Sequence, residues 1–160
     1  MESLNSDLRI NLIAKNTEYY IDRFDRMEET GRSNTWNWGA FLVPFCWLAY
    51  RKLYLECVAY YLVTNGLNTV ITQLLTSHGI VVNIGWTIDV VFMFMCGLYG
   101  NWLYKAKIGR QVERCLELEP SKREKYIKRH GGTSVIAIII AFCITIAFAG
   151  VLYKFNISVV

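Results

Sequence analysis

The chain has 160 residues, of which 54% are hydrophobic and 19% are charged, and its formal net charge is +4. The apolar residues gather into long stretches almost free of charge. This disfavours a soluble helical protein with three buried helices, because residues 135–152 offer no polar face to water. The basic residues gather in one loop rather than over a whole surface, so we expect no nucleic-acid partner.

The first 35 residues are predicted to form a cytosolic amphipathic helical arm. Tyr20, Phe24 and Met27 fall on one face of a helix over 17–30, and charged side chains occupy the other faces. The arm is either continuous or broken near Asn16, and Gly31 is suited to end it. The apolar face of the arm is predicted to contact either the membrane surface or the segment 105–130.

An aromatic segment, residues 36–52, follows the arm and marks where the chain enters a membrane. Residues 36–50 are fifteen uncharged residues, too few to cross about 30 Å of hydrocarbon, which takes roughly 20 helical residues. Aromatic and basic side chains concentrate at headgroup depth. We therefore expect an interfacial helix in which Pro44 either makes a kink or opens a second helix. Its expected anchors are Trp36, Trp38, Trp47, Arg51 and Lys52.

Three apolar stretches are each long enough to span a bilayer, over residues 53–76, 87–104 and 133–153. The loop 105–132 holds nine Lys and Arg against four Glu, and loops rich in Lys and Arg stay in the cytoplasm. The expected fold is therefore an all-α integral membrane protein. Its membrane domain covers residues 36–160, with the N-terminus cytoplasmic, the C-terminus outside and a basic helical loop between the last two spans.

The first predicted span carries an unusual polar face. Its residues recur every fourth position, and a neighbouring row begins at Asn65. Polar groups in hydrocarbon need partners, so this face either forms hydrogen bonds with another helix or lines a water-filled cavity. The candidate residues, together with an acid near the outer end of the second span, are Glu56, Tyr60, Thr64, Asn65, Asn68, Thr72 and Asp89.

Small residues mark the expected helix-packing faces. Gly97 and Gly100 lie near the inner end of the second span, and the third span repeats Ala137, Ala141 and Ala149 at intervals of four or eight. Small side chains at such spacing let helix backbones approach closely. The basic loop between these spans is expected to attract anionic headgroups, at about 1 kcal/mol per basic residue, although topology alone accounts for its charge equally well.

The motif Trp-Asn-Trp-x-Ala-Phe at residues 36–41, followed by Pro-Phe-x-Trp-Leu-x-Tyr-Arg-Lys-x-Tyr at 44–54, resembles the signature of a family of small bacterial membrane proteins that carries a domain-of-unknown-function label. The sequences around Tyr19 and around Asn101 also resemble it. The resemblance covers about residues 18–105. It implies a bacterial inner-membrane location and supplies no activity.

No motif in the chain points to catalysis. Five cysteines, at 46, 57, 96, 115 and 143, show no paired spacing and no cluster with histidine, so we expect no disulfide framework, no metal and no cofactor. The two histidines, at 78 and 130, are expected on opposite sides of the membrane. Glu56 is expected to pair with a nearby cation or with the second span.

We therefore expect a non-catalytic membrane protein that acts through helix–helix or partner contacts, with the lipid bilayer and a second copy of itself as candidate partners. The alternative is a homo-oligomeric channel or small transporter lined by the polar face of the first span.

Overall fold

The computed structural model of this chain describes residues 2–80 and 85–157, without the side chains at 2, 148, 149 and 151–157. The described residues form eight helices and no strand, which confirms the all-α class. The helices are α1 (Glu2–Ile13), α2 (Thr17–Thr30), α3 (Trp38–Leu42), α4 (Pro44–Tyr50), α5 (Tyr54–Ser77), α6 (Gly85–Glu117), α7 (Pro120–His130) and α8 (Val135–Ile157).

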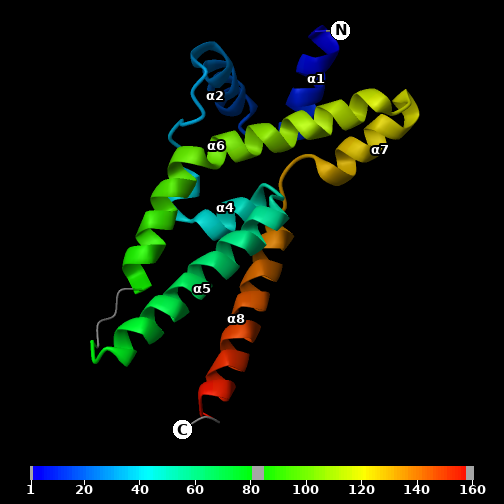
Figure 1. Ribbon diagram of the computed structural model, residues 1–160. Helices are drawn as coiled ribbons and strands as arrows, with labels where there is room; N and C mark the ends of the chain where they lie inside the picture. Colours follow the sequence, from blue (N-terminus) through cyan, green and yellow to red (C-terminus); the bar gives the residue numbers. More distant parts are fainter. Residues whose placement is uncertain (1, 81–84, 158–160) are drawn as a thin grey trace.

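The helices form two groups on opposite sides of a junction built from α3 and α4 (Figure 1). On one side, the C-terminal half of α6 crosses the molecule and carries α1, α2 and α7. On the other side α5, α8 and the N-terminal half of α6 extend away from the junction, and α6 bends where its two halves join. The buried core lies where these two groups meet.

The N-terminal arm is broken rather than continuous. Ala14 and Asn16 adopt left-handed backbone angles between α1 and α2, with φ of 58° and 56°, and Gly31 ends α2 in the same conformation at φ 64°. The apolar faces of both helices pack on α6, where Leu12 and Phe24 are almost fully buried. Of the two surfaces predicted to contact the arm, the structure therefore shows the segment that follows the second predicted span.

The aromatic segment consists of two short helices. The Asn37 side chain caps α3 by accepting a hydrogen bond from the Ala40 amide at 3.0 Å, and Val43 leaves the helical conformation. Pro44 then stands in the first turn of α4, where its missing N–H has no intrahelical partner to lose. Pro44 therefore opens a second helix instead of bending the first.

Two glycines in α6 let α3 lie directly against that helix. The amide of Asn37 donates to the Gly97 carbonyl at 2.8 Å. A Cβ atom at Gly97 would lie 2.9 Å from Phe41 Cβ, and one at Gly100 would lie 2.9 Å from Ala40 Cβ. The backbone approach at these two positions therefore leaves no room for a methyl group.

The three predicted spans correspond to α5, to the N-terminal half of α6 and to α8. Among the described residues, no single helix has both the length and the hydropathy to cross a bilayer. One bent pair, Pro120–His130 with Val135–Ala147 at 46°, meets both requirements together. The all-helical fold is therefore established, and the three spans stay a prediction.

The glycine contact between α3 and α6 can be tested by adding one methyl group. Gly100→Ala is expected to lower the free energy of unfolding by about 1–3 kcal/mol, because the added carbon overpacks the contact. Gly109→Ala in the same helix is the matched control, since nothing lies within 4 Å of a Cβ there. The control should be neutral or stabilising by up to about 1 kcal/mol. Equal thermal stability of both variants in detergent would contradict the contact.

Candidate functional site

The C-terminal ends of α1, α4 and α7 converge beside the junction, and three cations meet their carbonyl groups. The last four carbonyls of a helix have no partner within it and carry partial negative charge. The side chain of Arg51 reaches the Ile13 carbonyl at the end of α1 and the Lys15 carbonyl just beyond it. That of Lys52 reaches carbonyls at the end of α7, and that of Lys107 reaches the carbonyl that follows α4. We call Arg51, Lys52 and Lys107 the cation cluster.

Arg51 is the most deeply buried member of the cation cluster, with 2% of its surface exposed. Both terminal nitrogens donate to the Lys15 carbonyl at 3.1 Å, and Nη1 also donates to the Tyr104 hydroxyl at 3.3 Å. The guanidinium lies 4.3 Å from the centre of the Tyr20 ring and 5.0 Å from that of Tyr104. The sequence predicts Arg51 as an interfacial anchor; in the structure its side chain is enclosed by backbone carbonyls and aromatic rings of the same chain.

The two lysines of the cation cluster complete the pairing of the helix ends. Lys52 Nζ donates to the Gly131 carbonyl at 2.6 Å, and Lys107 Nζ donates to the Arg51 carbonyl at 2.5 Å. Burial lowers the pKa of Lys107 to about 8, with a further lowering by the charge of Lys52 and an opposing effect of Glu56. Burial also lowers the pKa of Lys52.

The three tryptophans expected as anchors have different surroundings. Trp47 is buried, and its Nε1 donates to the Tyr20 hydroxyl at 3.3 Å. Trp36 is half-buried, with its ring 5.0 Å from that of Phe41. Trp38 is 65% exposed, so of the three it alone presents most of its ring to the surroundings.

The polar face of α5 lies largely against α6. Glu56 Oε1 is 3.8 Å from Arg110 Nη2, which lies on α6 beyond the second predicted span. The Tyr60 ring packs edge-on against Phe92 at 6.2 Å. Farther along, Asn68 Nδ2 lies 3.5 Å from Asp89 Oδ1, Thr64 is buried and Thr72 is exposed. The face that the sequence singled out therefore makes contacts between two helices of the same chain.

The neighbouring polar row of α5 faces outward instead. Asn65 and Thr69 are exposed. The Asn65 side chain donates to the Tyr61 carbonyl at 2.8 Å, and the Thr69 hydroxyl donates to the Asn65 carbonyl at 2.9 Å. Both bonds stay within α5, so this row presents amide and hydroxyl groups to whatever surrounds the helix.

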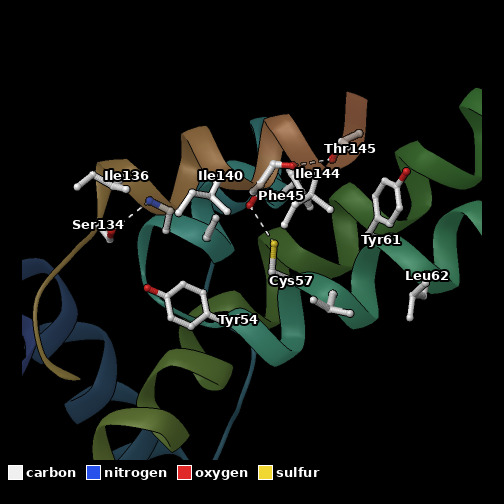
Figure 2. A pocket seen from close by; sticks show the side chains of 14 residues that line it. Phe45, Tyr54, Cys57, Tyr61, Leu62, Ser134, Ile136, Ile140, Ile144 and Thr145 are labelled. Atoms are coloured by element: carbon white, nitrogen blue, oxygen red, sulfur yellow. Dashed lines mark hydrogen bonds between the residues drawn. The ribbon is translucent and has the colours of Figure 1, made fainter. Parts of the chain in front are cut away.

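An apolar groove of about 480 Å³ lies between α5 and α8 and is closed at its base by α4 (Figure 2). Ser134 and Tyr54 stand at one end of it, whereas Tyr61, Leu62 and Thr145 stand at the other. Ala137 and Ala141, expected to pack helices together, line its α8 wall. The Ala149 side chain lies outside the described residues.

Sequence reasoning did not find the cation cluster or the groove. The cation cluster joins residues up to 79 positions apart, and the one local signal was a basic pair directly after an apolar helix. The groove depends on how far α5 and α8 diverge, which no spacing in the sequence expresses. Within the described residues no group of three or more His, Cys, Asp or Glu side chains is arranged to hold a metal ion.

Residues 7–110 match the model of a family described as a protein of unknown function (DUF2628). The matched segment begins within α1 and runs through α2 to α5 and α6 as far as Arg110, so it includes the cation cluster and leaves out α7 and α8. No curated protein and no solved structure matches the chain.

One substitution separates the hydrogen bonds that Arg51 makes from the effect of its charge. Arg51→Lys keeps the charge but loses the planar fork and the ring contacts, and it is expected to cost about 2–4 kcal/mol because the Ile13 and Lys15 carbonyls lose donors. Arg26→Lys is the control, since Arg26 lies on the exposed face of α2 in an ion pair with Asp22 worth about 0.5 kcal/mol. Comparable unfolding temperatures for the two variants would argue against the capping role.

The lowered pKa of Lys107 predicts that the stability of the protein depends on pH. Its pKa in the folded chain, about 8, lies below the ordinary 10.5, so the folded state binds fewer protons than the unfolded state between these values. The contribution of Lys107 to the free energy of unfolding should therefore rise with pH across this window, by up to about 3 kcal/mol. The difference in this free energy between the wild type and Lys107→Met should grow with pH by this amount, whereas the difference between the wild type and Lys125→Met, at an exposed site on α7, should stay constant. Parallel pH profiles of the wild type and Lys107→Met would refute the assignment.

Proposed function

The chain belongs to the DUF2628 family, and from that premise we propose that it is a non-catalytic integral membrane protein that acts through helix–helix contacts with a second copy or a partner at the cytoplasmic membrane. The non-catalytic role is supported by the sequence, which contains no nucleophile–base set, phosphate loop or metal-ligand spacing. The membrane placement is supported by the exposure of apolar side chains.

The observation that carries the proposal is the apolar surface of α5, α8 and the N-terminal half of α6. Contiguous exposed apolar surface of this kind marks contact with a membrane or with another protein. The large exposed side chains on these three helices include Leu55, Val58, Leu62, Val63, Val70 and Leu74 of α5, Val91, Phe94 and Met95 of α6, and Ile136, Ile139, Ile140, Phe142, Ile144 and Ile146 of α8. They all lie on the side of the junction away from α1, α2 and α7 (Figure 1).

Charge has the opposite distribution. The six Lys and Arg residues of segment 114–129 lie on the C-terminal end of α6 and on α7, beside α1 and not among the exposed apolar helices. Such segments stay in the cytoplasm, so we place α1, α2, α7 and residues 105–132 there and residues 36–52 at the inner interface. The 24 residues of α5, at about 1.5 Å each, are long enough for a bilayer.

The outward polar row at Asn65 and Thr69 supports the partner contact. Lipid tails offer no hydrogen bonds, so a span that exposes an amide is best satisfied by another helix. The same row favours the second candidate function, a homo-oligomeric channel, if several copies surround water with it. The two differ in one measurable property, since a channel conducts ions and a helix contact does not.

Topology is tested by labelling with a membrane-impermeant maleimide. With Cys143 replaced by Ala, Lys125→Cys in α7 should react in inverted vesicles and Ser77→Cys at the end of α5 should react in right-side-out vesicles. Cys115 is fully buried and should stay unlabelled in both. Reaction of both introduced cysteines from the same side would sink the proposed topology.

Assembly is tested with two asparagines of α5. Asn65→Leu removes the outward amide and should weaken self-association in detergent or nanodiscs by about 0.5–2 kcal/mol. Asn68→Leu is the matched control, because its amide faces Asp89 of the same chain and should change monomer stability without changing assembly. Loss of assembly in both variants, or in neither, would count against the outward contact. Ion flux in wild-type vesicles that Asn65→Leu abolishes would establish the channel instead.

A further inference from the structure

We propose that the groove between α5 and α8 holds an acyl chain of an anionic phospholipid, whose headgroup lies at the Ser134 end against the neighbouring lysines. The inference rests on the membrane placement of α5 and α8. It goes further, because it assigns a ligand class to a defined cavity, of which one wall, α8, lies outside the matched family segment.

The shape of the groove suits a hydrocarbon chain. Its volume of about 480 Å³ falls within the roughly 300–1,000 Å³ range of small-molecule sites. Its walls are formed by apolar side chains such as Val58, Ile140 and Ile144. It follows α5 and α8 away from α4 (Figure 2), so a chain lying in it would run in the direction of the proposed spans.

Polar and basic side chains lie near the Ser134 end of the groove, outside its lining. The Ser134 amide donates to the Tyr50 carbonyl at 2.9 Å. Thr133 and the Lys15 ammonium lie near the Tyr50 hydroxyl, and both lower the pKa of Tyr50. Lys52 Nζ uses two of its three donors on carbonyls of the segment 129–131.

The lysines near this end favour a lipid over a second copy of the chain as the occupant of the groove. Where the structure describes the chain, neither Lys15 nor Lys52 forms an ion pair. A second copy would bring the same lysines to this depth, and like charges would meet. An anionic headgroup instead complements them, and basic residues at the inner surface attract such headgroups. The apolar groove and its charged end together match the two parts of one phospholipid.

The test uses the full chain in phosphatidylcholine vesicles that contain a trace of chain-spin-labelled phosphatidylglycerol or, separately, chain-spin-labelled phosphatidylcholine. The measured quantity is the protein-immobilised fraction of each label. The wild type should prefer the anionic lipid at least fivefold. Lys15→Gln should lower this preference by up to about fivefold, the factor for one basic residue at an anionic surface. Lys15 holds Arg51 through its backbone carbonyl, so this substitution leaves that contact in place.

The groove is tested by filling it. Val58 lines the groove and is 56% exposed, whereas Val70 on the same helix is 62% exposed and does not line it. Val58→Trp should abolish the preference for phosphatidylglycerol, and Val70→Trp should retain it. Lys125→Gln, on α7, is the control for the general attraction of the basic loop and should retain it as well.

Three results would overturn the inference. Equal immobilisation of both lipids by the inserted wild type would remove the specificity. An unchanged preference in Val58→Trp would mean that the basic loop alone attracts the headgroup. A changed oligomeric state in Val58→Trp, but not in Val70→Trp, would identify a second copy as the occupant. Failure of the wild type to float with vesicles would reject the membrane proposal itself, and it is measured separately from lipid preference.

Discussion

The structure depends on pairing the carbonyl groups where α1, α4 and α7 end together. Each helix brings partial negative charge and carbonyls without an intrahelical partner to the same place. Arg51 meets the end of α1, Lys52 that of α7 and Lys107 that of α4. Without these donors, the carbonyls that they meet at three partly buried helix ends would lose a partner, at about 1–3 kcal/mol for each one lost.

This pairing also sets the direction in which the remaining helices leave the junction. The Gly132 amide donates to the Leu12 carbonyl at 2.7 Å, and the Ser134 amide donates to the Tyr50 carbonyl at 2.9 Å. A Cβ at Gly131 would lie 2.8 Å from the Ile127 carbonyl oxygen and 3.1 Å from Leu12 Cα, so glycine relieves crowding both with the last turn of α7 and with α1. These contacts hold the start of α8 at the base of α4, and the groove is the space left as α8 diverges from α5.

A second polar site joins α3 to α6. Asn37 Nδ2 donates to Asn101 Oδ1 at 2.7 Å, and Asn101 Nδ2 lies 3.0 Å from the Thr35 hydroxyl. Both asparagines are buried, and their amides are paired because buried polar groups without partners are costly. Together with the contacts at Gly97 and Gly100, this pair sets the position of the aromatic segment on α6, and the cation cluster sets its position relative to α1 and α7.

The polar face of α5 shows why a pattern of residues leaves their role open. The four-residue spacing correctly places Glu56, Tyr60 and Asn68 together, and they meet α6. Asn65 directly follows Thr64 of this row, so it is rotated about 100° around the helix axis and faces outward. Periodicity gives the relative direction of side chains on one helix, but the rotation of that helix against its neighbours depends on packing between distant segments.

By itself the sequence determined the all-helical class, the positions of α2, α5, α6 and α8, the stop at Gly31 and the shared face of the α5 polar residues, because propensity, periodicity and capping are local properties. Only the tertiary structure decided that the arm breaks before α2 and rests on α6, that Pro44 opens a helix, that Arg51 is buried and that α5 and α8 enclose a groove. Each of these depends on groups far apart in the chain. The sequence showed that Arg51 and Lys52 are basic, and the converging helix ends decided that their charge is used inside the protein.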